Sequence, residues 1–260
     1  YNGTTVTRNN VSMPNGGFGI YMNVNQNPNG TRNLIANNMV YVGGTQSVTS
    51  YGLYDNNSTN TDYLYNSFNM ANTGVNSIAF NYQYHTGCYD YLKNNIAVNS
   101  GPGQVLYLYN YNTTLKGINY NNWYGKGTQL GTYNGTIYNS LTAWKTGSNK
   151  DSNSISVLPY FYGLNDLHVL NPKLNAAATP VSLIGDDYDK QIRNTSTPDI
   201  GADEFTPASV DAGVNAFENP IGNFCAGTKN ITVTLTNFGL TTLTSTTINW
   251  TVNGTTQTAY

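Results

Sequence analysis

The amino-acid sequence predicts an all-β fold, with a solenoid of parallel strands over residues 1 to 206 and a smaller β region over residues 207 to 260. Three observations predict it: a repeat of about 28 residues, a composition poor in helix formers, and a change of composition after Phe205. Asn, Gly and Tyr contribute 42, 26 and 22 of the 260 residues, and these residue types favour turns and strands. The repeats are therefore expected to stack as strands and not as helices.

The chain carries few charges. Asp, Glu, Lys and Arg make up 9% of the residues, against about 25% in an average domain, and the formal net charge is −2. We expect no nucleic-acid partner, because phosphate binding depends on clustered Lys and Arg. We also expect no membrane span, because no apolar stretch approaches the roughly 20 residues needed. The chain opens at Tyr1 in polar, β-like sequence without a signal peptide, which predicts a piece processed or cut from a longer protein.

The repeat is marked by asparagine. Five short segments align without gaps and place this residue at Asn9, Asn37, Asn66, Asn94 and Asn121, in steps of 28, 29, 28 and 27. The positions two residues before and after are mostly apolar and share a strand face with the asparagine, so we expect these side chains to point inward. Identical amides stacked at the strand spacing of about 4.8 Å can bond one another, which predicts a buried structural Asn ladder.

A second strand recurs in each repeat, with an apolar residue expected inside and the next residue expected outside. The inward set is Ile20, Leu53, Ile78, Leu106 and Ile137. The outward set is Tyr21, Tyr54, Ala79, Tyr107 and Tyr138, with Tyr109 and Tyr111 continuing the same face. A flat strip of tyrosines can stack sugar rings, so its six tyrosines, Tyr21, Tyr54, Tyr107, Tyr109, Tyr111 and Tyr138, are the candidate glycan-binding residues. The alternative is that they only stabilise the sheet by cross-strand pairing.

Acidic residues are scarce in the repeats, which contain Asp55, Asp62 and Asp90 and no Glu before residue 150. Asp62 and Asp90 occupy equivalent positions of consecutive repeats, so their carboxylates are expected about 5 Å apart. Such a pair can share a proton or a cation, as in glycosidases and calcium sites. The alternative is a solvated corner at which each carboxylate caps the following strand.

Other candidate ligands lie later in the chain. Asp186, Asp187 and Asp189 have the close spacing of oxygen ligands in Ca²⁺ loops, and the alternative is an Asp-rich turn that bonds its own backbone. His85 lies three residues before Cys88, but His168 is the only other histidine, so no zinc site is predicted. Calcium is the only cofactor that the sequence suggests.

At the level of families, residues 1 to about 162 resemble right-handed parallel β-helix repeat proteins, the architecture of pectate-lyase-like enzymes and many surface proteins. From about residue 163, the segments 171–189 and 198–205 resemble the stretch that ends such β-helices in secreted bacterial proteins. This resemblance implies a right-handed β-helix over residues 1–206, with a final segment that caps its open end, where unpaired strand edges would promote aggregation.

The region after Phe205 alternates polar and apolar residues at 231–236 and 247–252, and Asn253-Gly254 has the sequence of a hairpin turn. It resembles the start of an immunoglobulin-like β-sandwich in large bacterial surface proteins exported by the type IX route. Its 54 residues fall short of the roughly 100 that such a fold uses, so residues 207–260 are expected to be an incomplete, partial sandwich.

The resemblance implies an extracellular or cell-surface location. We expect a non-catalytic module of an adhesin or scaffold that binds a polysaccharide or cell-surface glycan and is joined to further domains of the same chain. The alternative is a carbohydrate-active enzyme, a polysaccharide lyase or glycoside hydrolase, with catalytic turns upstream of Tyr1 or at Asp62 and Asp90.

Overall fold

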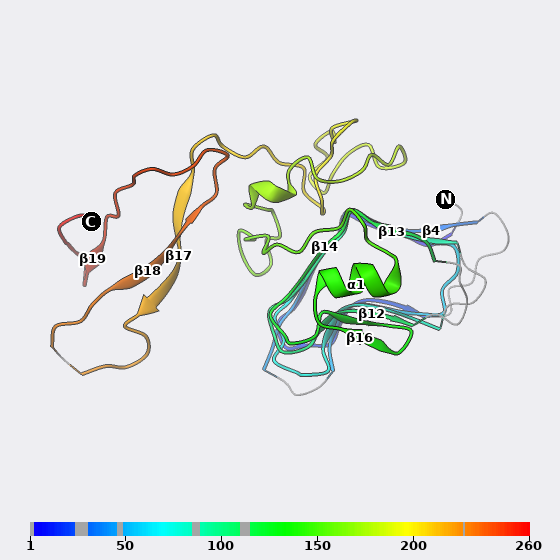
Figure 1. Ribbon diagram of the computed structural model, residues 1–260, viewed down its shortest axis with the longest axis horizontal. Coiled ribbons are helices and arrows are strands. Elements are labelled where there is room, and N and C mark those ends of the chain that lie inside the picture. Colours follow the sequence, from blue (N-terminus) through cyan, green and yellow to red (C-terminus); the bar gives the residue numbers. More distant parts are fainter. Residues whose placement is uncertain (1–2, 24–30, 46–48, 85–88, 110–114, 226) are drawn as a thin grey trace. The chain divides into compact units, whose positions relative to one another are not determined.

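The computed structural model describes residues 3–23, 31–45, 49–84, 89–109, 115–225 and 227–260. Its contacts divide the chain into two compact units, Tyr1–Phe205 and Thr206–Tyr260. The first unit is a parallel β-solenoid, in which each turn adds one strand to each of three sheets (Figure 1). The predicted all-β fold class, with parallel strands stacked as a solenoid, is confirmed.

The first sheet contains β1 (Thr5–Thr7), β4 (Asn33–Ala36), β7 (Thr61–Leu64), β10 (Asp90–Lys93) and β13 (Leu115–Asn119). The second contains β2 (Asn10–Met13), β5 (Met39–Val42), β8 (Ser67–Met70), β11 (Ile96–Asn99) and β14 (Asn122–Gly125). The third contains β3 (Phe18–Asn23), β6 (Tyr51–Asn56), β9 (Ile78–Gln83), β12 (Gln104–Tyr109), β15 (Gly131–Tyr133) and the antiparallel β16 (Thr136–Tyr138).

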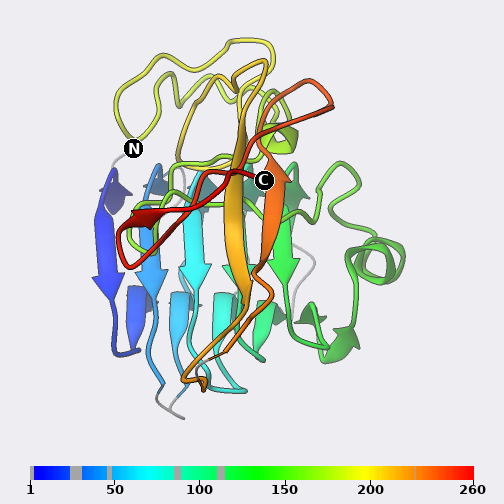
Figure 2. The same ribbon diagram turned by 90° about the vertical axis from the view of Figure 1, so that its left-hand side faces the viewer.

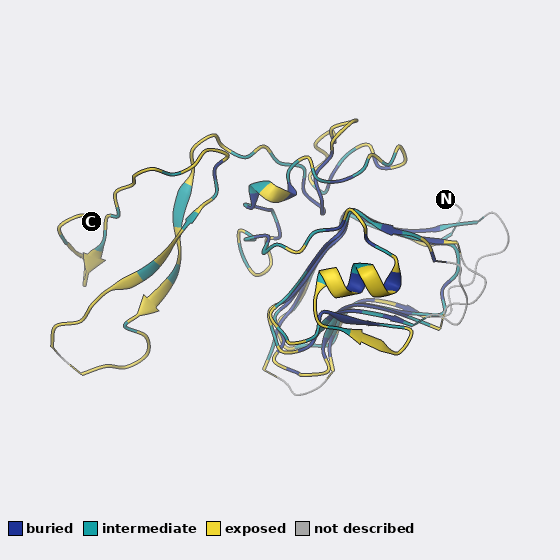
Figure 3. Ribbon diagram, viewed as in Figure 1, coloured by how far each residue is buried: buried dark blue, intermediate teal, exposed yellow. Residues whose placement is uncertain are grey.

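Apolar side chains from all three sheets fill the interior of the solenoid. Ile35, Val40, Phe80, Leu92 and Trp123 are fully buried there. Gly19 belongs to the same interior, because a Cβ at this position would lie 2.3 Å from a methyl group of Val40. Figure 3 shows buried residues, in dark blue, concentrated along the stacked strands of the solenoid.

A ladder of asparagines lines the corner between the first and second sheets. The amide of Asn9 donates to Asn38 (2.9 Å), Asn38 to Asn66 (2.9 Å), Asn66 to Asn95 (2.9 Å) and Asn95 to Asn121 (3.1 Å). Each acceptor oxygen also receives the backbone N–H of the same donor residue. All members except Asn9 are buried, so the ladder satisfies amides that would otherwise be costly inside the protein.

The ladder differs from the predicted one at two of its five positions, where Asn38 and Asn95 replace Asn37 and Asn94. The residue before each ladder position adopts a left-handed backbone, with φ between 53° and 58° at Arg8, Asn37, Tyr65 and Tyr120 and 61° at Asn94. Asparagine tolerates this conformation better than most residues. In the two turns with paired asparagines, the first therefore makes the corner and the second enters the ladder.

The end of the solenoid is closed by the helix α1 (Leu141–Ser148), which lies inside the outline of the stacked strands, between β14 and β12, in the view of Figure 1. Its Trp144 is fully buried and packs edge-on against Tyr133 and Tyr138. The indole N–H of Trp144 donates to Asp151 (2.8 Å), which also accepts the last amide of the ladder from Asn121 (3.2 Å). Burial raises the pKa of Asp151, although its hydrogen bonds act in the opposite direction.

The expected capping segment lies elsewhere. Residues 156–205, here called the covering segment, run lengthwise along the outside of the solenoid and contain the short 3₁₀ helix η1 (Pro172–Leu174). This segment contacts Arg8 in the first turn through Asp187 and Asn94 in the fourth through Thr179. It buries the outer apolar side chains of the first two sheets, including Leu64 and Ile96. The prediction that it caps the open end is therefore wrong, because outward apolar residues require a cover along the side.

The second unit contains two small antiparallel sheets. Strand β17 (Ala212–Asn219) pairs with β18 (Thr232–Asn237), and β19 (Thr251–Val252) pairs with β20 (Thr255–Thr256) around the predicted Asn253-Gly254 turn (Figure 2). The alternation at 231–236 matches β18 to within one residue, whereas the pattern at 247–252 yields a strand only at its end. Strand β17 was not predicted.

Within the part of the chain that the structure describes, no helix combines the length and apolar character required to cross a membrane.

Candidate functional site

The outer face of the third sheet carries a cluster of aromatic side chains, here called the aromatic face. Strand register places Phe18 beside Tyr51 and Tyr21 beside Tyr54. Tyr107 lies in the same column as Tyr54, two turns further along the solenoid. The aromatic face comprises Phe18, Tyr21, Tyr51, Tyr54, Tyr107 and Tyr109.

Two parallel ring pairs form one end of the aromatic face. The rings of Tyr21 and Tyr54 are stacked with centroids 5.3 Å apart and an interplanar angle of 13°. Phe18 and Tyr51 are stacked at 5.0 Å and 25°. Edge-to-face contacts join the two pairs, with Tyr51 and Tyr54 at 4.8 Å. Tyr21 remains 54% exposed and Phe18 43% exposed, so a broad apolar surface faces solvent.

Amide side chains interrupt the rings. Gln83 donates to the hydroxyl group of Tyr54 at 2.6 Å. Asn81 lies in register between Tyr54 and Tyr107, and its Oδ1 atom is buried without a hydrogen-bond partner. A buried acceptor without a partner is costly, and a ligand could reach this oxygen only if the side chains that cover it moved.

The aromatic face is uncharged. Its outward columns in β3, β6, β9 and β12 hold aromatic, aliphatic and amide side chains, while Asp55 of β6 points inward and accepts the hydroxyl hydrogen of Tyr63. Burial raises the pKa of Tyr51, Tyr54 and Tyr107 above the ordinary tyrosine value, so these hydroxyl groups stay neutral at physiological pH. The site therefore offers ring faces, hydroxyl groups and amides.

The structure unites only part of the predicted tyrosine strip. Tyr21, Tyr54, Tyr107 and Tyr109 lie on the aromatic face, whereas Tyr111 lies outside the described residues, as do His85 and Cys88. Tyr138 packs against Trp144 at the solenoid end because β16 runs antiparallel to β15.

Two parts of the predicted alternation are wrong. Ile78 is in register with Tyr51 and Phe80 takes the interior position, so Asn81 and not Ala79 occupies the tyrosine column. Ile137 is 51% exposed and not inward. Sequence reasoning missed Phe18 and Tyr51 of the aromatic face, and Asn81 in its tyrosine column. An alignment of the repeats on the small residues Gly19, Gly52 and Ala79 could have placed them. Phe18 and Tyr51 come one residue before the small residue of their repeat, and Asn81 comes two residues after Ala79.

The expected Asp62–Asp90 pair does not form. Asp62 is in register with Tyr91 and forms an ion pair with Arg32, whereas the Asp90 carboxylate accepts the Tyr82 hydroxyl hydrogen at 2.5 Å. The register is offset by one residue, so the two side chains leave opposite faces of the sheet. Both are buried, which also contradicts the solvated-corner interpretation.

The predicted calcium triplet is divided among three partners. Asp186 forms an ion pair with Arg8, Asp187 is buried and accepts the backbone N–H groups of Gln191 and Glu204, and Asp189 contacts His168. Asp187 therefore has the turn-stabilising role that was the alternative.

Comparison with known proteins gives no match to the chain among protein-family models, curated proteins or solved structures. Function therefore has to be inferred from the chemistry of the sites.

Proposed function

We propose that this chain is a non-catalytic, glycan-binding module of a secreted or cell-surface adhesin or scaffold. The aromatic face is the observation that supports this proposal, because adjacent exposed rings on a rigid sheet match the apolar faces of sugar rings. The Gln83 amide and the tyrosine hydroxyl groups supply hydrogen bonds that would fix the orientation of a sugar.

The uncharged character of the aromatic face favours a neutral glycan over a uronate-rich one. Binding to a polyanion gains from Lys and Arg, and the outward columns of β3, β6, β9 and β12 contain neither. Catalysis at Asp62 and Asp90 is not favoured, because their separation across the sheet leaves no shared space for a glycosidic bond.

Binding is tested with the native chain on an array of neutral and acidic polysaccharides, followed by calorimetric titration of any hit. The double variant Tyr54→Ala plus Tyr107→Ala should weaken binding at least tenfold, because two ring surfaces are lost. Tyr54→Phe plus Tyr107→Phe keeps the rings and should retain most of the affinity. Tyr162→Ala, at a tyrosine that is 66% exposed on the covering segment, is the matched control.

Two outcomes contradict the proposal. If the alanine double variant lowers the melting temperature but leaves glycan binding unchanged, the aromatic face only stabilises the sheet. If the native chain binds no glycan on the array, the face has another use.

We also propose that the solenoid is a right-handed, pectate-lyase-like β-helix, that Thr206–Tyr260 begins an immunoglobulin-like sandwich, and that the whole protein is exported by the type IX route. The sandwich is supported by the β17–β18 pair, whose Val214 and Phe217 are 50% and 53% exposed, as expected before a facing sheet is added. A structure of the full-length protein should show strands packed against Val214 and Phe217. A bare two-stranded ribbon in that structure would contradict it.

A further inference from the structure

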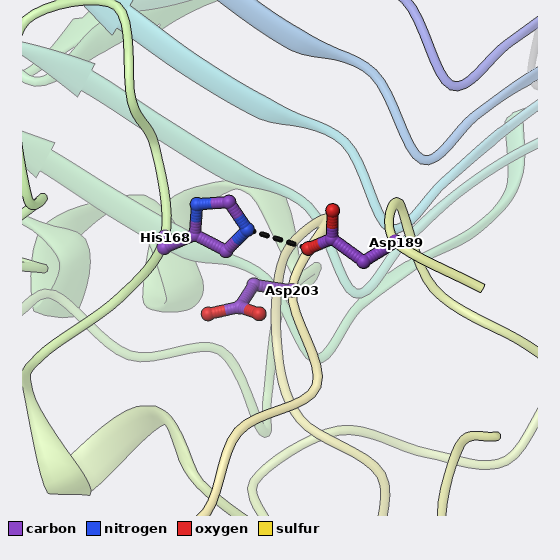
Figure 4. A group of neighbouring side chains, drawn as sticks. All are labelled: His168, Asp189 and Asp203. Atoms are coloured by element: carbon purple, nitrogen blue, oxygen red, sulfur yellow. Dashed lines mark hydrogen bonds and ion pairs between the residues drawn. The ribbon is translucent and has the colours of Figure 1, made fainter. Parts of the chain in front are cut away.

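Three parts of the covering segment bring one histidine and three carboxylates together. His168 lies between Asp166 and Asp189: its Nδ1 atom contacts the Asp166 carboxylate, and its Nε2 atom lies 2.6 Å from Oδ2 of Asp189. Asp203 completes the group, since one ligand atom each from His168, Asp189 and Asp203 lie within 4.8 Å of one another (Figure 4).

The surrounding charges leave this group rich in negative charge. Asp203 is only 3% exposed, and one of its oxygens accepts the backbone N–H of Val169 at 3.0 Å. The neighbouring Arg8 is paired with Asp186, and Arg193 is paired with Glu204. Three carboxylates therefore face one imidazole.

We propose that His168, Asp189 and Asp203 bind a divalent transition metal, with Zn²⁺ as the best fit. One imidazole nitrogen and two carboxylate oxygens are ordinary zinc ligands, and water would take the fourth position. An imidazole ligand favours zinc over Ca²⁺ and Mg²⁺, which prefer oxygen.

Asp166 contacts the ring nitrogen of His168 on the opposite side from Asp189. Histidines that ligate metals almost always donate their second ring nitrogen to a carboxylate or carbonyl oxygen, which fixes the tautomer and the ring orientation. Asp166 is therefore a positioning residue, and Nε2 of His168 is the ligand atom.

The same metal would fasten the covering segment. Leu167 and Ala202 adjoin two ligands in sequence, and both are buried against Met39 of the solenoid. A metal that joins His168 to Asp203 would hold these two stretches of the covering segment on the second sheet.

The test uses the whole chain after removal of metals with a chelator and desalting. Titration with ZnCl₂ in a calorimeter should show one site per chain, and zinc at about 100 times its Kd should raise the Tm of the solenoid by about 5 °C or more. Co²⁺ should give the visible absorption bands of a four-coordinate site. CaCl₂ at the same concentration should produce a smaller shift.

Variants separate ligand roles from folding, because each is compared with its own metal-free state. His168→Gln and Asp189→Asn should abolish the zinc-dependent rise in Tm, and Asp166→Asn should weaken zinc binding about 10- to 100-fold. Asp186→Asn, in the same loop but paired with Arg8, is the control and should bind zinc like the native chain. Absence of zinc binding by the native chain, an equal response of His168→Gln, or a preference for Ca²⁺ would each overturn the proposal.

Discussion

The Asn ladder makes Asn66→Leu a sensitive test of the fold. The Asn66 side chain donates to Ile35 O (2.8 Å) and Asn95 Oδ1 (2.9 Å), and it accepts both the backbone and the side-chain N–H groups of Asn38. Leucine would leave the buried backbone N–H of Asn38 without this acceptor, at a cost of about 1 to 3 kcal/mol. The Asn38 amide keeps its bond to Val6 O, and Asn95 Oδ1 keeps the Asn66 backbone N–H, so these losses are smaller.

The expected total is about 3 kcal/mol, which corresponds to a fall in Tm of about 6 to 12 °C for a unit of this size. Urea unfolding followed by circular dichroism measures it. Asn9→Leu is the matched control, because Asn9 is the exposed first member of the ladder, and its loss should cost under about 1 kcal/mol. Equal effects of the two substitutions, or a neutral Asn66→Leu, would refute the ladder as a source of stability.

Three further predictions concern the solenoid end and the covering segment. Trp144→Ala should lower the free energy of unfolding by about 3 to 5 kcal/mol through lost burial and a lost donor to Asp151, and Trp144→Phe should cost less. Arg193→Met should make residues 156–205 the first site of limited proteolysis, because Arg193 is 3% exposed and holds Glu204 and the carbonyl groups of Gly201 and Ala202. Burial raises the pKa of Asp199 from 3.8 to about 7, so the folded chain keeps a proton that the unfolded chain releases. Protonation of Asp199 therefore contributes fully to stability below about pH 4, and this contribution is lost as the pH rises through about 7. Over this range the free energy of unfolding should fall by up to about 1.4 kcal/mol per pH unit. Asp199→Asn should remove this slope from urea unfolding curves.

Each of these has a result that contradicts it. An unchanged unfolding midpoint for Trp144→Ala would mean that α1 does not close the core. First cleavage outside residues 156–205 in Arg193→Met would separate Arg193 from the docking of that segment. Equal pH slopes in the native chain and Asp199→Asn would assign the titration to other buried acids.

The sequence by itself determined the period, the parallel stacking and the use of asparagine in a buried ladder. These features depend on residue types repeated every turn, and a repeated turn has one way to stack its interior side chains. It also determined that Tyr21, Tyr54 and Tyr107 share a column, because they follow interior apolar residues in three turns. The same alternation failed at Ile78, where two consecutive positions of the strand face the interior.

Only the tertiary structure decided which member of each asparagine pair enters the ladder. Asn37 and Asn38 are chemically identical, and the left-handed corner before the strand selects between them. Strand register likewise decided the positions of Asp62 and Asp90. The register is shifted by one residue from the predicted one, and such a shift places the two side chains on opposite faces of the sheet. The convergence of His168, Asp189 and Asp203 was likewise decided by tertiary structure, since the covering segment has no period and its path follows the outer apolar side chains of the solenoid. Periodic contacts can be inferred from sequence, whereas contacts between aperiodic segments depend on the surface against which they pack.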